Sequence, residues 1–299
     1  MAIISRTIYT QGQVKIQSGS DAGPWAVVSG VQSASVSYSS PNQTVNSFGT
    51  RGIIDNVQLE PETASTTFSY ILPSGTGIGL HISPVMINQL MTNSVLDAPV
   101  PMHVTIAGVG KVISGYLSSI SVNASVGDLA TCEMTFEGVP SGGVAGNDAD
   151  GERPDTVASV AAVAYPVLTP DKISGIGPAV NTPDNVPATN DIGGFGAAAQ
   201  SATFSWEIPV ERVMSLGDLP ANATAFTNPP GTSSMTVEGM DVPLGITGLV
   251  VGGYTFGLGT QGRVSSREHN LAVGDVGATF SVTVDSTADA CTCVATPVV

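Results

Sequence analysis

An internal repeat constrains this chain more than any other feature of its sequence. The segment QSASVSYSSPNQTVNSFG, which begins at Gln32, aligns without a gap with QSATFSWEIPVERVMSLG, which begins at Gln200. Eight of the eighteen positions are identical, including the proline that is Pro41 in one copy and Pro209 in the other. Two further blocks recur in the same order, and the last holds Val-Gly-Asp in both copies. A serine-rich composition can imitate one block but not the order of three, so the repeat predicts a gene duplication.

The duplication predicts two tandem modules in the 299-residue chain. We expect the first over residues 1–149 and the second over residues 150–299, a length that suits two ordinary domains. The boundary falls in the stretch 138–155, whose glycines, aspartates and prolines are typical of a linker.

The repeated segments alternate with period two. Ala34, Val36 and Tyr38 alternate with serines in the first copy, as Phe204 and Trp206 alternate with serine and threonine in the second. Such alternation predicts β-strands with one buried and one wet face. One helix is expected over Ser83–Asn93. Further strands are expected over 4–9, 13–17, 53–59, 64–72, 104–107, 111–122 and 233–238, and loops over 179–199 and 216–232. The fold class is therefore all-β, with at most one or two short helices, as two tandem β-sandwich or barrel modules.

Charge excludes several partners. The formal net charge is −15, and the nine lysines and arginines are scattered along the chain. Tight nucleic-acid binding needs a basic patch, so neither it nor docking to an anionic membrane is expected. The start of the chain lacks the basic and then apolar layout of a signal peptide. Free thiols are expected at Cys132, Cys291 and Cys293, with a metal or an inter-subunit bridge as the alternative.

No pattern of an active site is found. The histidines His81, His103 and His269 are dispersed, and neither a nucleophile elbow nor a phosphate-binding loop occurs. The paired carboxylates Glu60 with Glu62 are expected to form a solvated rim. We therefore predict that the chain is not an enzyme and that it uses no metal and no cofactor.

An acidic, all-β chain without an active site is expected to be an assembly protein. Its N-terminal hairpin, the strands SASVSYSSP and SATFSWEIP, the single helix and the Val-Gly-Asp turn resemble those of bacteriophage tail tube (major tail) proteins. The resemblance implies homo-oligomeric rings that stack into a hollow tube, with other tail proteins as partners and DNA as non-specific cargo. It also implies a place in the virion tail after assembly in the host cytoplasm, with no membrane. Since six modules close such a ring, a duplicated chain would supply them as a pseudo-sixfold trimer.

Two sets of residues are the candidates for these contacts. Acidic side chains that line the lumen would repel DNA phosphates, and the candidates are Asp55, Glu60, Glu62, Glu207 and Glu211. Strand edges and loops that become buried only on assembly would join the subunits, and the candidates are Ile8, Tyr9, Val14, Pro41, Phe48, Pro209 and Leu216.

Other classes of function stay open at this point. A different virion component, such as a capsid decoration protein, a tail terminator or a baseplate adaptor, fits the same composition. A carbohydrate-binding β-sandwich needs exposed aromatic rings, whereas Trp206 falls on the predicted core face. A hydrolase on a β scaffold needs a nucleophile and a base, and no such constellation is visible.

Overall fold

The fold is all-β, as the alternation predicted, with one α-helix among the described residues. The computed structural model describes residues 14–18, 26–28, 30–46, 48–49, 51–58, 60, 62–72, 82–95, 102–106, 110–125, 128–140, 199–213, 224–227, 231–239, 248–251, 254–271 and 279–295. In the first half the elements are β1 (Val14–Ser18), β2 (Ala26–Val28), β3 (Val31–Ser39), β4 (Asn42–Val45), β5 (Asp55–Gln58), β6 (Thr63–Ile71), α1 (Pro84–Ser94), β7 (Met102–Ile106), β8 (Gly110–Ser125) and β9 (Thr131–Pro140). In the second half they are β10 (Ala199–Glu207), β11 (Val210–Val213), β12 (Thr224–Thr227), β13 (Thr232–Gly239), β14 (Gly248–Val251), β15 (Tyr254–Gly257), η4 (Gly259–Gln261), β16 (Arg263–Asn270), β17 (Thr279–Thr287), η5 (Ala288–Ala290) and β18 (Thr292–Ala295).

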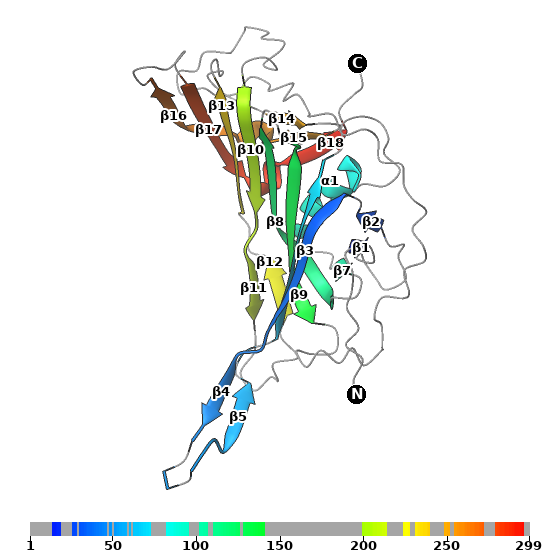
Figure 1. Cartoon of the computed structure of the whole chain (residues 1–299), viewed down its shortest axis with the longest axis vertical. Helices are drawn as coiled ribbons and strands as arrows, with labels where there is room; N and C mark the ends of the chain where they lie inside the picture. Colours follow the sequence, from blue (N-terminus) through cyan, green and yellow to red (C-terminus); the bar gives the residue numbers. More distant parts are fainter. Residues whose placement is uncertain are drawn as a thin grey trace.

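Eight strands form one antiparallel sheet in the order β3-β6-β9-β8-β10-β13-β17-β16 (Figure 1). The first part of the 16-residue strand β8 pairs in addition with β7, through which β1 and β2 extend the sheet. Strands from both sides of residue 150 thus lie in a single sheet, joined where β8 pairs with β10.

Four strands follow one another in the same order in the two halves. The order β3-β6-β9-β8 in the first half matches the order β10-β13-β17-β16 in the second. The register matches as well, since Ser37 lies opposite Ser65 in the first half and Ser205 lies opposite Ser234 in the second. The residue numbers of the equivalent serines differ by 168 or 169, which is the separation of the repeated sequence blocks.

Irregularities of the sheet recur at matching positions. The register shifts at Gln32 between β3 and β6, and at Gln200 between β10 and β13. The hairpins β4-β5 and β11-β12 also have four residue pairs each. The duplication as an event, and the division at residues 149 and 150, remain predictions, because the proposed boundary lies outside the described residues.

The core lies on one side of the large sheet. In Figure 1 the helix α1 and the strands β1, β2, β7, β14, β15 and β18 lie on that side. Phe204 of β10 stacks on Phe256 of β15, with ring centroids 5.1 Å apart. The indole N–H of Trp206 donates to the carbonyl oxygen of Ala288 at 2.9 Å, which satisfies the polar atom of a fully buried ring. The predicted core position of Trp206 is thus confirmed.

The predicted helix is present as α1. The side chain of Ser83 accepts a hydrogen bond from the backbone N–H of Met86, and Pro84 occupies the first turn. Ile87 and Leu90 bury their side chains in the core. None of the helices in the described part of the chain is long and apolar enough to cross a membrane.

Two expectations were wrong. The stretch 216–232 was expected to be a loop, but it contains β12, which pairs with β11 as β5 pairs with β4. Ala34 and Tyr38 were expected to be buried, but both are exposed, Tyr38 to 37 %. The reason is that β3 is an edge strand, which leaves its core-side residues less covered than those of the central strands.

Candidate assembly surfaces

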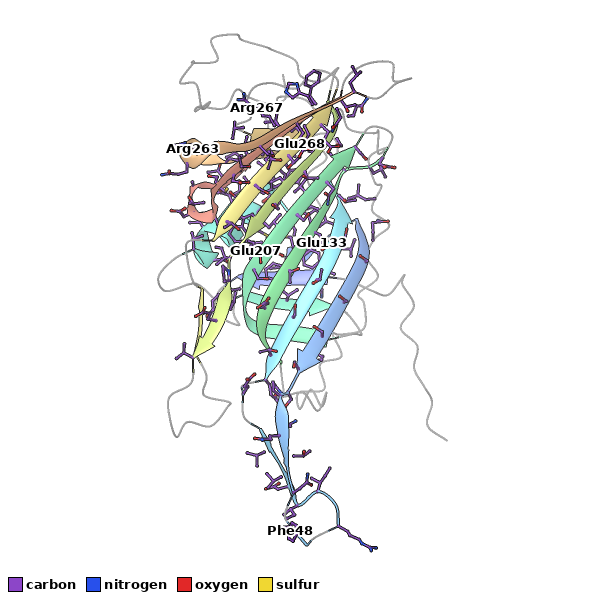
Figure 2. All side chains as sticks on the ribbon, turned by 90° about the vertical axis from the view of Figure 1, so that its left-hand side faces the viewer. Phe48, Glu133, Glu207, Arg263, Arg267 and Glu268 are labelled. Atoms are coloured by element: carbon purple, nitrogen blue, oxygen red, sulfur yellow. The ribbon has the colours of Figure 1, made fainter. Side chains whose placement is uncertain are left out.

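The side of the large sheet that faces away from the core carries hydroxyl groups on every strand. We call this surface the polar face (Figure 2). Threonine and serine side chains bond across the strands, as between Thr67 and Thr135 at 3.1 Å and between Ser205 and Ser234 at 2.8 Å. Such cross-strand pairs stabilise the sheet from its polar face.

Carboxylate side chains also lie on the polar face. Glu133 and Glu207 project from it in Figure 2, and Ser201 donates a hydrogen bond to Glu238 at 3.2 Å. Among the side chains that the structure describes, its carboxylates are Glu133, Glu137, Glu207, Glu238, Glu268 and Asp285. Arg263, opposite Asp285, is the cation described there. The surface is therefore hydroxylated and negative, which is suited to repelling phosphates over a screening length of about 8 Å at physiological salt.

The predicted lumen acids divide between two places. Glu207 lies on the polar face, where the strand alternation put it. Asp55 lies on β5 and Glu211 on β11, so both belong to the hairpins, and Glu60 and Glu62 lie between β5 and β6. The alternation also contained the signal for Glu133 and Glu238, because each follows a buried residue in a strand of period two.

The β4-β5 hairpin, residues 42–58, projects from one end of the sheet as an arm (Figure 1). Phe48 at its tip is fully exposed, at 108 % of its reference area. Large apolar side chains are exposed along the rest of this arm, namely Val45, Ile53, Ile54 and Val57. So many exposed apolar residues on one hairpin indicate a contact surface.

The other interface candidates differ in position. Pro209 is exposed next to β10, and Pro41 is half-buried at the base of the arm. Val14 is 2 % exposed and packs in the core, so its side chain is not available at the surface of this chain. Ile8, Tyr9 and Leu216 lie outside the described residues.

The three cysteines are free and buried. Burial raises the pKa of the Cys132 thiol to about 12 and that of Cys291 to about 11, so both thiols are protonated at neutral pH. Cys291 donates to the hydroxyl of Ser233 at 2.9 Å. No cluster of three or more potential metal-ligating side chains occurs within the described ranges.

A shallow depression of about 700 Å³ lies at the end of the β8-β10 junction. Its lining consists of small and polar residues, with Leu129 as the largest apolar one. No aromatic ring lines it, so it does not offer the stacking platform of a sugar-binding site.

No family model and no curated protein matches this chain.

Proposed function

We propose that this chain is a structural virion protein of a phage tail. In this proposal it assembles into rings that stack into the tail tube, through which DNA passes. The observation that carries the proposal is the run of eight strands, β3-β6-β9-β8-β10-β13-β17-β16, which has a hydroxylated, acidic face and an edge strand at either end. Its partners are other copies of itself and other tail proteins, and its place is the virion tail after assembly in the host cytoplasm.

The layers of the fold support the direction in which the sheet would curve. A sheet that closes into a ring has one face inside and the other outside. The core side carries α1 and the β14-β15-β18 sheet as a further layer, which needs the larger radius outside. The polar face therefore lines the lumen, where its carboxylates keep DNA from adhering.

The recurring strand pairs support a duplicated module. We infer that the order and register shared by the two halves come from the predicted duplication. Each chain then brings two sixths of a ring, and three chains close it with pseudo-sixfold symmetry.

Negative-stain electron microscopy of the purified chain over a range of concentrations tests the function. Open-ended tubes built from stacked rings are the expected result. Closed single rings or isolated trimers would instead indicate another virion component, such as a decoration protein, a tail terminator or a baseplate adaptor. A chain that stays monomeric at every concentration, checked by analytical ultracentrifugation, contradicts the proposal.

A further inference from the structure

Among the described residues, the strand order β3-β6-β9-β8-β10-β13-β17-β16 ends on either side in a strand that has one neighbour. β3 pairs with β6 alone, and β16 pairs with β17 alone. They lie at opposite edges of the large sheet, so they do not pair within one chain (Figure 2). We propose that β3 of one copy pairs with β16 of the next copy, in the register that β10 and β8 use inside the chain. This deepens the proposed function and rests on its repeated module.

The β8-β10 junction is the template for this contact. Seven consecutive residue pairs join the two strands in antiparallel register, from Ser201 opposite Ser125 to Glu207 opposite Ser119. The backbone N–H of Ile208 then donates to the carbonyl oxygen of Ser118 at 2.8 Å. In the repeat, β3 is equivalent to β10 and β16 is equivalent to β8. The two edge strands are therefore equivalent to two strands that pair within the chain.

The residue pairs of the β8-β10 junction can be mapped onto β3 and β16 without a gap in either strand. β3 matches β10 at a constant offset of 168 residues. β16 matches β8 through their partners, since Ser121 lies opposite Glu133 in the first half and Glu268 lies opposite Ser281 in the second. The transferred pairs are Ala34 with Leu271, Ser35 with Asn270, Val36 with His269, Ser37 with Glu268, Tyr38 with Arg267, and Ser39 with Ser266.

The two faces of the strands agree with this register. In every transferred pair both residues come from the same face, so Ser37 and Glu268 both extend the polar face. Ala34 and Leu271 both fall on the core side. A slip of one residue would set the polar face of one copy against the core side of the other.

Core-side residues that are exposed at the edges β3 and β16 are equivalent to residues that are buried at the β8-β10 junction. Trp206 is fully buried in β10, whereas its counterpart Tyr38 in β3 is 37 % exposed. Ala124 is buried in β8, whereas its counterpart Leu271 beyond β16 is 73 % exposed. Exposed large apolar residues at the two edges are the residues that a neighbouring copy would cover.

The side chains of the transferred pairs are complementary. The Ser37 hydroxyl faces the Glu268 carboxylate and can donate to it, as Ser201 donates to Glu238 within the chain. The Tyr38 ring faces the Arg267 guanidinium, which favours stacking of a cation on an aromatic ring. The two edges differ in chemistry, so the contact is head-to-tail, the type of contact from which a ring is built when the rotation between copies closes.

Disulfide trapping in the full-length chain tests the register. In the variant Ser37→Cys with Glu268→Cys, the two new thiols of adjacent copies lie directly opposite each other, within the Cα spacing of about 4.4–6.8 Å that a disulfide spans. Mild oxidation is expected to give reducible multimers on a non-reducing gel. Ser39→Cys with Ser266→Cys is a second pair in the same register, in case the first variant fails to fold.

Two matched variants control the experiment. Ser35→Cys with Glu268→Cys lies on the same face but two residues out of register, and we expect no multimers from it. Ser121→Cys with Ser205→Cys places thiols at the template junction, where an intramolecular disulfide is expected. The native thiols are buried and remain in every variant.

The outcomes separate this inference from the proposed function. Multimers from the out-of-register pair as abundant as those from the in-register pairs overturn the register. Assembled particles in microscopy without cross-links in either in-register pair overturn the edge pairing but leave the proposed tube standing. Absence of both assembly and cross-links overturns both.

Discussion

The phenolic hydroxyl of Tyr254 donates a hydrogen bond to the carbonyl oxygen of Ile82 at 2.8 Å, across 172 positions of sequence. Tyr254 belongs to β15 in the second half, and Ile82 precedes α1 in the first. A second bond links the same regions, from the backbone N–H of Cys293 to the side-chain oxygen of Asn88 at 3.0 Å. Buried residues of the two halves therefore pack in one hydrophobic cluster.

Tyr254→Phe tests this link between the halves. The substitution keeps the ring but leaves the buried Ile82 carbonyl without its donor, which costs about 1–3 kcal/mol of unfolding free energy. Urea unfolding measures the loss. Val294→Ala, at an exposed position of the neighbouring strand β18, is expected to change stability by less than about 0.5 kcal/mol. Equal effects of the two substitutions would contradict the role of the hydroxyl.

Gly231→Ala tests the close approach of backbone beside β10. A Cβ at Gly231 would overlap the carbonyl oxygen of Glu207 and lie 2.6 Å from Cγ1 of Ile208. Backbone on one side cannot yield as a flexible side chain does, so we expect a loss at the upper end of the roughly 1–3 kcal/mol typical of overpacking. Gly49→Ala is the comparison: nothing lies within 4 Å, so its cost comes from its φ of +89° alone. A smaller loss at Gly231 than at Gly49 would disprove the steric reason.

Stability is expected to fall at alkaline pH. Burial raises the pKa of Cys132 from 9.0 to about 12, so the folded state keeps a proton that the unfolded state releases. The stabilisation is full below about pH 9 and is lost progressively as the pH rises towards 12. Urea unfolding between pH 7 and pH 10 measures the slope. Cys132→Ala lowers the overall stability and should reduce that slope, to which Cys291 also contributes. An unchanged slope would assign it to groups other than Cys132.

The proposed place of the polar face in a tube lumen predicts how its charge affects the binding of DNA. Glu133→Lys or Glu207→Lys places a cation on that face, so assembled particles should retain a short DNA duplex at low salt and release it as salt rises. Asp289→Lys makes the same change of charge at an exposed position in η5, off the sheet, and should retain less DNA. Electrophoretic mobility of labelled duplex reports the difference. Equal retention of DNA by all three variants would contradict the proposal that the polar face lines the lumen.

The β4-β5 arm predicts a loss of assembly without a loss of fold. Phe48→Ser removes a fully exposed ring, so the thermal midpoint of unfolding should stay unchanged while polymer formation falls. Val85→Ser, at an exposed apolar position on α1, is the matched control and should assemble normally. Light scattering follows polymerisation in both. Normal polymers from Phe48→Ser would exclude the tip of the arm from subunit contacts.

Sequence reasoning found the strands and the helix because their signals are local. Alternation in β10 marks Trp206 as buried, and Ser83 followed by Pro84 marks the start of α1. The exposure of Tyr38 was not predictable in this way, because β3 has the same alternation as β10. The two strands differ only in their neighbours, which are set by sheet order.

For the candidate surfaces too, the sequence predicted the local features and not those that depend on the order of strands in the sheet. Period two already placed Glu133 and Glu207 each on the wet face of its own strand. It did not separate that face from the hairpins, so Asp55 and Glu211 were grouped with Glu207 although they lie on β5 and β11. Val14 is a contact candidate because the N-terminal hairpin is expected to offer a free strand edge, whereas β1 lies between β2 and β7 and the Val14 side chain packs in the core.

The β8-β10 junction has a kinetic consequence for a ring built from such chains. Each polypeptide arrives with one of its two lateral contacts already made by covalent continuity, at an effective concentration that free modules do not reach. Only half of the lateral contacts in a closed ring then depend on encounters between molecules. Fewer molecules must therefore associate to form the first ring. Ring formation should begin at a lower protein concentration than for a single-module homologue of equal edge affinity.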